Sequence, residues 1–364
     1  MKPRIAITGH AAGDYGYPHA HFRHFDQTVE IILPSVTFRV SLLDKFQGGK
    51  APAIIPDELW RHAADLRYGG GGVQSACAAK LAAPDVGMRY LEACRPTELL
   101  QRQLSYPGLD VEFLNLRVVP RNAILGGGSD RIILKSRLEG APPFGPEELR
   151  KLDWLTEAPC VLANSVKDDP VIGHLAQAAE ANRIRLHVVV TKSLETDFAR
   201  KAVLGAAHMI FASADEIGFL VGRKVTCDPA EALEALDWLR RHAAQATLYL
   251  TLGREGVLVA GPGLDSPRHV RLAQRPWEQV QERVGRDSTK LCGAGDAFAA
   301  GVTVHQQTGK SLLAGAPPSY APELNAALAG CALAVRWIGW EPPLSESDFI
   351  IKKLSWPTRA AAAA

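Results

Sequence analysis

The most informative stretch of this sequence is Cys292-Gly293-Ala294-Gly295-Asp296-Ala297-Phe298-Ala299-Ala300-Gly301. Its glycines open a run of good helix formers, which predicts the start of a helix. The first amide groups of a helix have no partner within the helix, and the helix dipole favours negative charge beside them. Small residues let an anion come close to these amides, so Gly293, Ala294 and Gly295 are predicted to form an anion site.

Asp296 stands directly beside this predicted anion site. A carboxylate at this place can take a proton from a substrate hydroxyl while the amides hold a transferring phosphoryl group. The alternative interpretation is that Asp296 only caps the helix and that the glycines form a tight turn. The stretch by itself leaves both interpretations open.

Short apolar runs alternate with helical stretches along much of the chain. The runs predicted to be buried strands are Ile5–Thr8, Val161–Asn164, Leu186–Val190, Met209–Ala212 and Leu248–Leu252. The helices predicted between them are Val171–Asn182, Glu195–Gly205 and Pro229–Ala244. Apolar runs with little polar alternation are typical of parallel strands. The repetition of strand and helix predicts an α/β fold with a doubly wound, mainly parallel central sheet flanked by helices.

Two further stretches, Val29–Leu43 and Val111–Lys135, hold β-branched and apolar residues with little helical period. They are predicted to form antiparallel strands outside the main sheet. The glycines Gly126–Gly128 are predicted to form a hairpin turn within the second stretch. We therefore expect one domain over residues 1–364, with a small β lid built from parts of residues 15–60 and 111–140.

Composition excludes several classes of function. The chain has 364 residues, of which 47% are hydrophobic, and 41 basic against 39 acidic residues leave a net charge of +2. This balance argues against nucleic acid or an acidic membrane surface as a partner, and no apolar run reaches the roughly 18 residues of a membrane span. The start of the chain turns into Gly9-His10 too soon for a signal peptide. Six scattered cysteines without a Cys-x-x-Cys pair fit reduced thiols, so we expect a cytoplasmic protein.

The stretch Gly293–Phe298, with Gly301 following, resembles the Gly-Ala-Gly-Asp motif of the ribokinase-like (PfkB) carbohydrate kinases. Other segments resemble elements of this family in the same order. Ile5–Gly9 followed by Asp14 is similar to its first strand and substrate-binding aspartate. Gly69-Gly70-Gly71-Gly72-Val73-Gln74 is similar to its Gly-Gly substrate motif, and the resemblance implies that Gly69, Gly70 and Gln74 contact the substrate.

The later segments resemble the nucleotide and metal elements of the family. Ser213-Ala214-Asp215-Glu216 stands at the place of its Asn-x-x-Glu motif, which implies that Glu216 helps to organise Mg²⁺, usually through water. Thr251–Gly256 resembles its Thr-x-Gly-x-x-Gly nucleotide loop, which implies nucleotide contacts from Thr251, Gly253 and Gly256. Asn325–Arg336 is similar to the helix that flanks the adenine, which implies a contact from Asn325.

The resemblance implies a kinase that uses ATP and Mg²⁺ to phosphorylate a hydroxyl of a sugar or sugar-like molecule, with Asp296 as the general base. Lids in this family often pair between subunits, which implies a homodimer through the lid. The sequence also departs from the family. Lys290-Leu291-Cys292 stands where an acidic residue that serves a monovalent cation is usual, Ser213 replaces an asparagine, and 54 residues separate Asp14 from Gly69. The substrate itself is therefore not implied.

Three functions from different classes remain open. The first is a kinase for a sugar or, alternatively, a nucleoside. The second is a nucleotide- or sugar-binding member of the same fold with weak or no catalysis, which the departures at Lys290–Cys292 and Ser213 suggest. The third is an unrelated doubly wound enzyme in which Asp296 is only a helix cap.

Three other groups of residues suggest alternative sites. His19, His21 and His24 near Asp14 and Asp26 suggest a metal site, but a loop facing solvent or substrate explains them more simply. The glycines at 69–72 suggest a dinucleotide fingerprint, which requires a preceding strand that is not obvious here. Trp337 and Trp340 are interpreted as packing residues rather than as a platform for base stacking.

Overall fold

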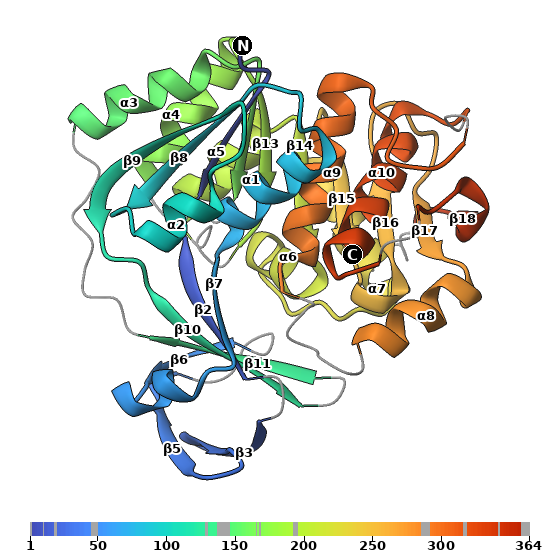
Figure 1. Cartoon of the computed structure of the whole chain (residues 1–364). Coiled ribbons are helices and arrows are strands. Elements are labelled where there is room, and N and C mark those ends of the chain that lie inside the picture. Colours follow the sequence, from blue (N-terminus) through green and yellow to red (C-terminus); the bar gives the residue numbers. More distant parts are fainter. Residues whose placement is uncertain are drawn as a thin grey trace, which may run out of the picture.

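The computed structural model of the chain contains two β-sheets (Figure 1). It describes residues 2–9, 11–17, 20–44, 50–127, 130–136, 146–164, 166, 169–191, 196–284, 292–315, 319–340 and 343–357. Among these residues, no helix is both long enough and apolar enough to cross a membrane.

The main sheet has ten strands within the described residues. In order across the sheet they are β18 (Phe349–Lys353), β17 (Arg268–Leu272), β16 (Val257–Ala260), β15 (Thr247–Thr251), β14 (Met209–Ser213), β13 (Arg185–Val189), β12 (Cys160–Asn164), β1 (Ile5–Gly9), β8 (Met88–Cys94) and β9 (Leu109–Arg117). The strands from β15 to β9 are parallel, and the three at the other edge are antiparallel. The predicted doubly wound, mainly parallel sheet is confirmed.

All five strands predicted from apolar runs are present, as β1, β12, β13, β14 and β15. Every residue of β1 and of β12 is buried. The reason is that helices cover both faces of the sheet, so a strand in its centre has no solvent side that requires polar residues. This is why an uninterrupted apolar run predicted these strands correctly.

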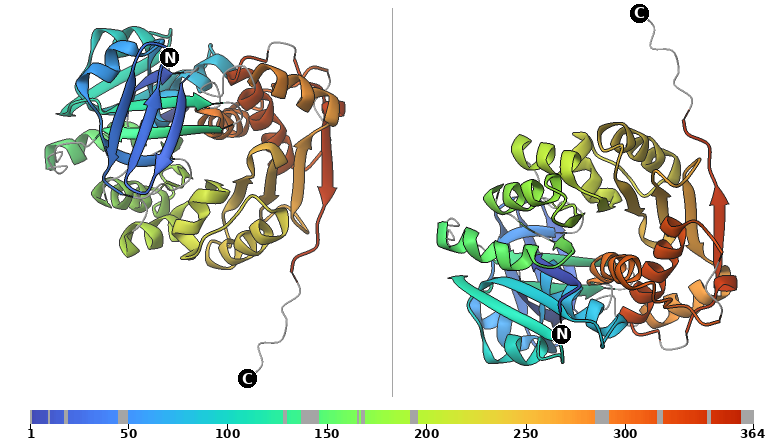
Figure 2. Two further views of the ribbon diagram at one scale, coloured as in Figure 1. Left: turned by 90° about the horizontal axis from the view of Figure 1, so that it is seen from below. Right: turned by 90° about the horizontal axis from the view of Figure 1, so that it is seen from above.

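The helices form two layers on opposite faces of the main sheet, as Figures 1 and 2 show. One core lies under α3 (Pro146–Thr156), α4 (Asp169–Glu180), α5 (Asp197–Ala206), α6 (Ala214–Val221) and α7 (Pro229–His242). The other core lies under α1 (Gly71–Ala82), α2 (Glu98–Gln103), α8 (Gln274–Val284), α9 (Ala294–Thr308) and α10 (Pro322–Trp337). The helices predicted in α4, α5 and α7 are confirmed.

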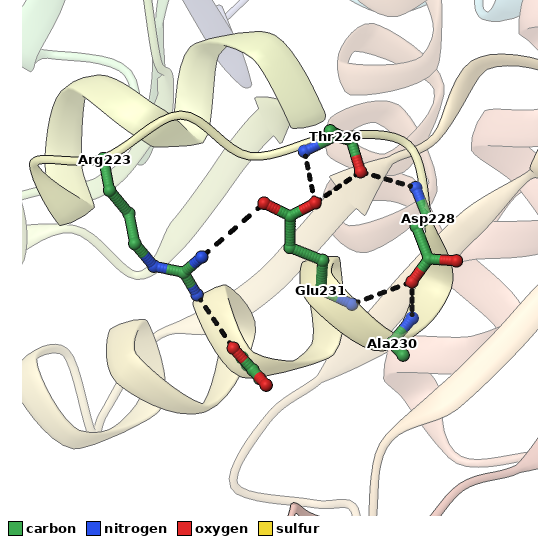
Figure 3. A network of polar contacts seen from close by, with 6 residues as sticks. Arg223, Thr226, Asp228, Ala230 and Glu231 are labelled. Atoms are coloured by element: carbon green, nitrogen blue, oxygen red, sulfur yellow. Dashed lines mark hydrogen bonds and ion pairs between the residues drawn. The ribbon is translucent and has the colours of Figure 1, made fainter.

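Local contacts fix the start of α7 (Figure 3). Asp228 is the N-cap, and its carboxylate accepts from the amides of Ala230 and Glu231 at 2.9 and 3.1 Å. The Glu231 carboxylate in turn accepts from Thr226 and forms an ion pair with Arg223. Such capping contacts are encoded within a few residues, so the sequence indicates them without knowledge of the tertiary fold.

The second sheet has eight strands within the described residues. In order they are β3 (His21–Phe25), β4 (Thr28–Ile32), β5 (Thr37–Leu42), β6 (Lys50–Ile54), β11 (Asp130–Ser136), β10 (Arg121–Gly127), β2 (Ala12–Tyr17) and β7 (Asp65–Gly69). A third core on this sheet includes Val29, Ile31, Val40 and Leu59, the last from a 3-10 helix at Asp57–His62. The antiparallel pair predicted in Val29–Leu43 is confirmed as β4 and β5.

The prediction that all of Val111–Lys135 lies outside the main sheet is wrong. Its first part belongs to β9, which pairs in parallel with β8 in the main sheet. Val111 packs against one core and Leu114 against the other, so the apolar residues follow from burial on two faces rather than from a lid. The rest forms the antiparallel hairpin of β10 and β11, and residues 128 and 129, in the predicted turn, lie outside the described residues.

The main sheet contains a buried carboxyl group close to the first turn of α1. Glu92 of β8 is fully buried, accepts a hydrogen bond from the Cys94 amide at 2.9 Å, and is hydrogen-bonded to the Tyr90 hydroxyl. Burial raises the pKa of Glu92 above its ordinary value. A Cβ atom added at Gly72 would lie 2.8 Å from the Tyr90 hydroxyl, so this pair supports the first turn of α1.

We expect Glu92→Gln to change how the stability of the protein depends on pH. Because the folded pKa is raised, the unfolded chain loses this proton first above about pH 4.3, and the free energy of unfolding falls as pH rises further. Glutamine accepts from Cys94 and donates to Tyr90 but does not titrate. In urea unfolding, the variant should match the wild type near pH 4 and exceed it near pH 8. A variant that is less stable than the wild type only at the higher pH would show that Glu92 is needed in its charged form.

Candidate active site

The carboxyl ends of the parallel strands bring the predicted motifs to one edge of the main sheet. Gly9 ends β1 and pairs with Asn164 at the end of β12, while Ser213 ends β14 and pairs with Thr251 at the end of β15. Helices α1, α6 and α9 begin at this edge, on the side of the second sheet (Figure 1). Ligands of open α/β sheets bind at the carboxyl ends of strands, so this edge is the candidate site.

The predicted anion loop forms the start of α9. Gly293 is the N-cap and has a left-handed φ of +83°, and Ala294 is the first residue of the helix. Asp296 is therefore the third residue of the helix and not its cap, which removes the interpretation of Asp296 as an N-cap. Its carboxylate Oδ1 accepts from the Asn164 amide at 2.8 Å, and its carbonyl accepts from the Ser75 hydroxyl at 3.4 Å. Asp296 is half-buried, and Gly295 is exposed.

Two helices hold the anion loop in place at Gly293. A Cβ atom there would lie 2.7 Å from Oε1 of Gln74 in α1 and 2.8 Å from Nε1 of Trp337 in α10. The Trp337 ring also donates to the carbonyl of Cys292 at 3.0 Å. Trp337 was interpreted from the sequence as a packing residue, and its contact with the loop could not be predicted because it joins segments 45 residues apart.

The residues predicted to bind the substrate lie together where the second sheet meets α1. Asp14 of β2 is adjacent to Gly69 of β7, since a Cβ atom at Gly69 would lie 1.8 Å from Asp14 Oδ2 and 2.9 Å from Gln74 Nε2. The other carboxylate oxygen of Asp14 accepts from the Asn122 amide at 2.9 Å. Gln74 thus contacts both the Asp14–Gly69 pair and the anion loop. Asn122 was not predicted, because nothing in its own neighbourhood marks it.

A strand that was not obvious from the sequence leads into the glycines at 69–72. The strand is β7, and Gly70, with φ +83°, is the N-cap of α1. This strand was missed because its sequence, Asp-Leu-Arg-Tyr-Gly, has few apolar residues. It belongs to the second sheet, so it does not form the strand–turn–helix unit of one parallel sheet that a dinucleotide fingerprint requires.

Glu216 lies in the first turn of α6, close to the same edge. Ser213 is the N-cap of this helix, and its hydroxyl accepts from the Glu216 amide at 3.3 Å and donates to the Glu216 carboxylate at 2.9 Å. The serine that replaces the asparagine of the motif therefore both caps the helix and orients the carboxylate.

The predicted nucleotide loop connects β15 to β16 through a 3-10 helix at Gly253–Glu255. Thr251 donates to the carbonyl of Ala212 at 3.3 Å, which ties the loop to β14. Gly253 and Gly256 both have left-handed φ values, +58° and +92°. A Cβ atom at Gly256 would lie 2.1 Å from the carbonyl oxygen of Val270, whereas one at Gly253 would meet nothing within 4 Å.

Residues 147–316 match the model of the pfkB family of carbohydrate kinases. The match includes Ser213–Glu216, the nucleotide loop and the anion loop with Asp296. The chain carries a PfkB domain. The family predicted from the sequence is confirmed, and because PfkB family carbohydrate kinases are phosphotransferases that act on hydroxyl groups, so is the class of enzyme.

Solved structures share the fold over almost the whole chain. An adenosine kinase from Sinorhizobium meliloti has a TM-score of 0.62 at 18% identity, covering 96% of this chain and 97% of that one. A ribokinase from Giardia lamblia has a TM-score of 0.61 at 16% identity, covering 93% and 92%. A ribokinase from Arabidopsis thaliana, in complex with ribose and ATP, has a TM-score of 0.56 at 15% identity, covering 94% and 100%. No curated protein sequence matches the chain.

The contacts of Asn325 do not bring it to the anion loop. Asn325 donates to the carbonyl of Tyr320, and the start of α10 lies beside the end of α9, where Gln306 donates to Pro322. The opposite end of α10, at Trp337, contacts the anion loop. Twelve residues of helix correspond to about 18 Å, so Asn325 lies far from the anion loop, and its contact with the adenine stays a prediction.

The remaining predicted groups are only partly within the described residues. His21 and His24 are exposed on β3, at the edge of the second sheet, and His19 lies outside the described residues. Across the part of the chain that the structure describes, no group of three or more His, Cys, Asp or Glu residues could hold a metal ion. Lys290 and Leu291 also lie outside the described residues, so the monovalent-cation prediction is not tested.

Alanine substitution of the two loop glycines should give unequal effects. A left-handed φ alone costs about 1–2 kcal/mol for a residue with a Cβ atom, which is the loss expected for Gly253→Ala. Gly256→Ala should cost more, because the new Cβ also collides with the Val270 carbonyl and forces β16 and β17 apart. Thermal unfolding of the two variants and the wild type gives the stability losses. Equal losses in the two variants would contradict the close approach at Gly256.

Proposed function

We propose that this protein transfers the γ-phosphoryl group of ATP to a hydroxyl of a sugar or sugar-like small molecule, with Asp296 as the general base. The observation that carries the proposal is the position of Asp296, in the first turn of α9 directly after the anion loop, with its carboxylate held by Asn164. The amides at Gly293–Gly295 and the carboxylate lie on one short segment, so charge stabilisation and proton removal occur at the same place.

In the proposed reaction, one bond to phosphorus forms as another breaks, and Asp296 takes the released proton. The acceptor oxygen forms a bond to the γ-phosphorus, the bond from that phosphorus to the bridging oxygen of ATP breaks, and ADP leaves. The hydroxyl proton passes to the carboxylate of Asp296. The loop amides hold the phosphoryl oxygens, which carry the charge during transfer.

The acceptor would lie between Asp14 and the anion loop. The Asp14 carboxylate accepts hydrogen bonds from hydroxyl groups, and the side chains of Asn122 and Gln74 offer both donors and acceptors. Gly69 and Gly70 let a sugar approach the backbone. This set suits a polyhydroxylated molecule, and Gln74 links it to the loop that would hold the phosphoryl group.

The nucleotide would lie along Thr251, Gly253 and Gly256, with Mg²⁺ near Glu216. When bound, Mg²⁺ neutralises the charge of the transferring phosphates. The donor chemistry fits, because a carboxylate oxygen is a ligand that Mg²⁺ prefers and the ion commonly keeps several waters. Support for ATP as the donor comes from the Arabidopsis ribokinase, which was solved with ribose and ATP.

A nucleoside is the second candidate acceptor, favoured by the similarity to the adenosine kinase. A catalytically weak binding protein is the remaining alternative, and the half-buried Asp296 with its fixed contact to Asn164 argues against it. ATP–Mg²⁺ should raise the melting temperature of both a kinase and a binder. Phosphate transfer to a panel of sugars and nucleosides then tests the proposal. If no acceptor is phosphorylated, the proposal is rejected and the binding protein without catalysis is the alternative that fits. The cytoplasmic location and the homodimer through the lid stay predictions.

We expect Asp296→Asn to separate catalysis from binding. Asparagine keeps the shape of the side chain but cannot accept the proton, and loss of a general base typically costs about 10²–10⁴ in rate. ATP affinity should persist or increase, because a negative charge close to the triphosphate is removed. Asp197→Asn is the control, since it removes a carboxylate from the first turn of α5, outside the candidate site. Near-normal turnover by Asp296→Asn would reject the proposed base.

Glu216→Gln should raise the Mg²⁺ concentration needed for half-maximal turnover, because a neutral amide attracts the hydrated cation less than a carboxylate does. Asp215→Asn is the matched control: it removes the same charge one residue away, from an exposed side chain of the same helix turn. A Mg²⁺ titration of turnover compares the two variants with the wild type. Curves that coincide for Glu216→Gln and the wild type would remove Glu216 from the metal site.

A further inference from the structure

Asn164 is a buried polar residue at the centre of the candidate site. It ends β12, and none of its surface is exposed. Its amide nitrogen lies within hydrogen-bond distance of three acceptors: Asp296 Oδ1 at 2.8 Å, Ser75 Oγ at 2.8 Å and the carbonyl of Gly71 at 3.0 Å. An amide carries two N–H donors, so these acceptors share them. A buried amide is costly unless it is hydrogen-bonded, and here its donors are fully used.

The three acceptors belong to two different helices. Asp296 is in α9, while Gly71 and Ser75 are in the first turns of α1. Asn164 itself lies on the main sheet, where its backbone pairs with Gly9 and with Val189 of β13. One amide group therefore connects the sheet to the helix that carries the proposed base and to the helix that carries the substrate motif.

The backbone at Asn164 leaves this side chain little freedom to move. A Cβ atom at Gly9 would lie 2.1 Å from the Asn164 carbonyl oxygen and 2.7 Å from Gly72 Cα. The end of β12 is thus in direct contact with the end of β1 and with α1. A catalytic group is held in its productive geometry by neighbours that are themselves fixed by packing and hydrogen bonds.

We propose that Asn164 is a positioning residue for the phosphoryl transfer: its amide fixes Oδ1 of Asp296 and favours the ionised carboxylate that takes the proton of the acceptor hydroxyl. A hydrogen bond donated to a carboxylate stabilises its charged form and lowers its pKa. An amide supplies this bond without titrating itself and without competing for the proton. The inference rests on the proposed function of Asp296 as the base.

Two substitutions at position 164 test the role through kinetics. Asn164→Leu has a similar shape and cannot donate, so kcat should fall by about 10²-fold, the cost of a misplaced catalytic group, with the KM for ATP unchanged. The acid limb of the plot of kcat/KM against pH should move to higher pH. The reason is that the Asp296 carboxylate loses the hydrogen bond that favours its ionised form. Asn164→Asp should move it further, since two adjacent carboxylates cannot both ionise easily and titrate as a coupled pair.

A double variant, compared with Asn164→Asp alone, tests the contact through stability. Asn164→Asp should lower the melting temperature at neutral pH by placing two carboxylates together. The double variant Asn164→Asp/Asp296→Asn restores one carboxylate and one amide in exchanged positions, so its melting temperature should return towards that of the wild type. Its turnover should stay lost, because the carboxylate now belongs to β12 and not to the anion loop.

Thr303→Val is the control for a general loss of stability. Thr303 lies in α9, is almost fully buried, and has its hydroxyl 2.9 Å from Nδ1 of His187, so the substitution removes a buried hydrogen bond from the same helix. It should lower the melting temperature and leave the pH profile unchanged. If Asn164→Leu behaves in the same way, Asn164 is only structural and the inference is overturned.

The proposed function and this inference fail in different ways. A wild-type protein that phosphorylates no acceptor rejects the function, and with it the positioning role of Asn164, whatever the stability of the variants. A wild type that is active, with additive stability losses in the double variant, rejects the contact between Asn164 and Asp296 alone. Transfer activity, a shifted acid limb and restored stability in the double variant together support the inference.

Discussion

The candidate site depends on a close backbone contact between two glycines, Gly9 and Gly72. Gly9 at the end of β1 and Gly72 in the first turn of α1 are so close that a Cβ atom on either would lie within 3 Å of the backbone of the other. This approach brings the start of α1 against the sheet, within reach of the Asn164 amide. Asn164 in turn holds Asp296, so the position of the proposed base follows from a packing constraint far from it in sequence.

Charge is distributed at this edge according to the cost of burial. The fully buried polar groups are neutral or hydrogen-bonded: Asn164 and Ser75 are uncharged, and burial raises the pKa of Glu92. The carboxylates with proposed roles in the reaction, Asp14, Glu216 and Asp296, are only half-buried. An ionised carboxylate is expensive to bury without a partner, and each of these three accepts from a neighbouring amide or hydroxyl group.

The sequence was sufficient where the signal is local. The apolar strands, the helix α7 and the start of α9 after the glycines each depend on a few adjacent residues, and these elements were predicted correctly. The errors arose where the signal is tertiary. β7 has few apolar residues, and β9 was assigned to the lid because its apolar residues face two cores. Asn164 ends a predicted strand, but nothing in the sequence indicated that Asp296 would face it.

The residues proposed to hold the phosphoryl donor and those proposed to hold the acceptor lie in different parts of the chain. The match to the pfkB family model covers residues 147–316, which contain the anion loop, the nucleotide loop and Glu216. Asp14, Gly69 and Asn122 lie outside that range, on strands of the second sheet. The elements that would hold the phosphoryl group are thus those the family shares, whereas the acceptor would be selected by side chains on β2, β7 and β10. Because the second sheet has its own core, residues facing the acceptor can differ between relatives without disturbing α9. The identity of the acceptor must therefore be sought in the second sheet, and not in the motifs that identify the family.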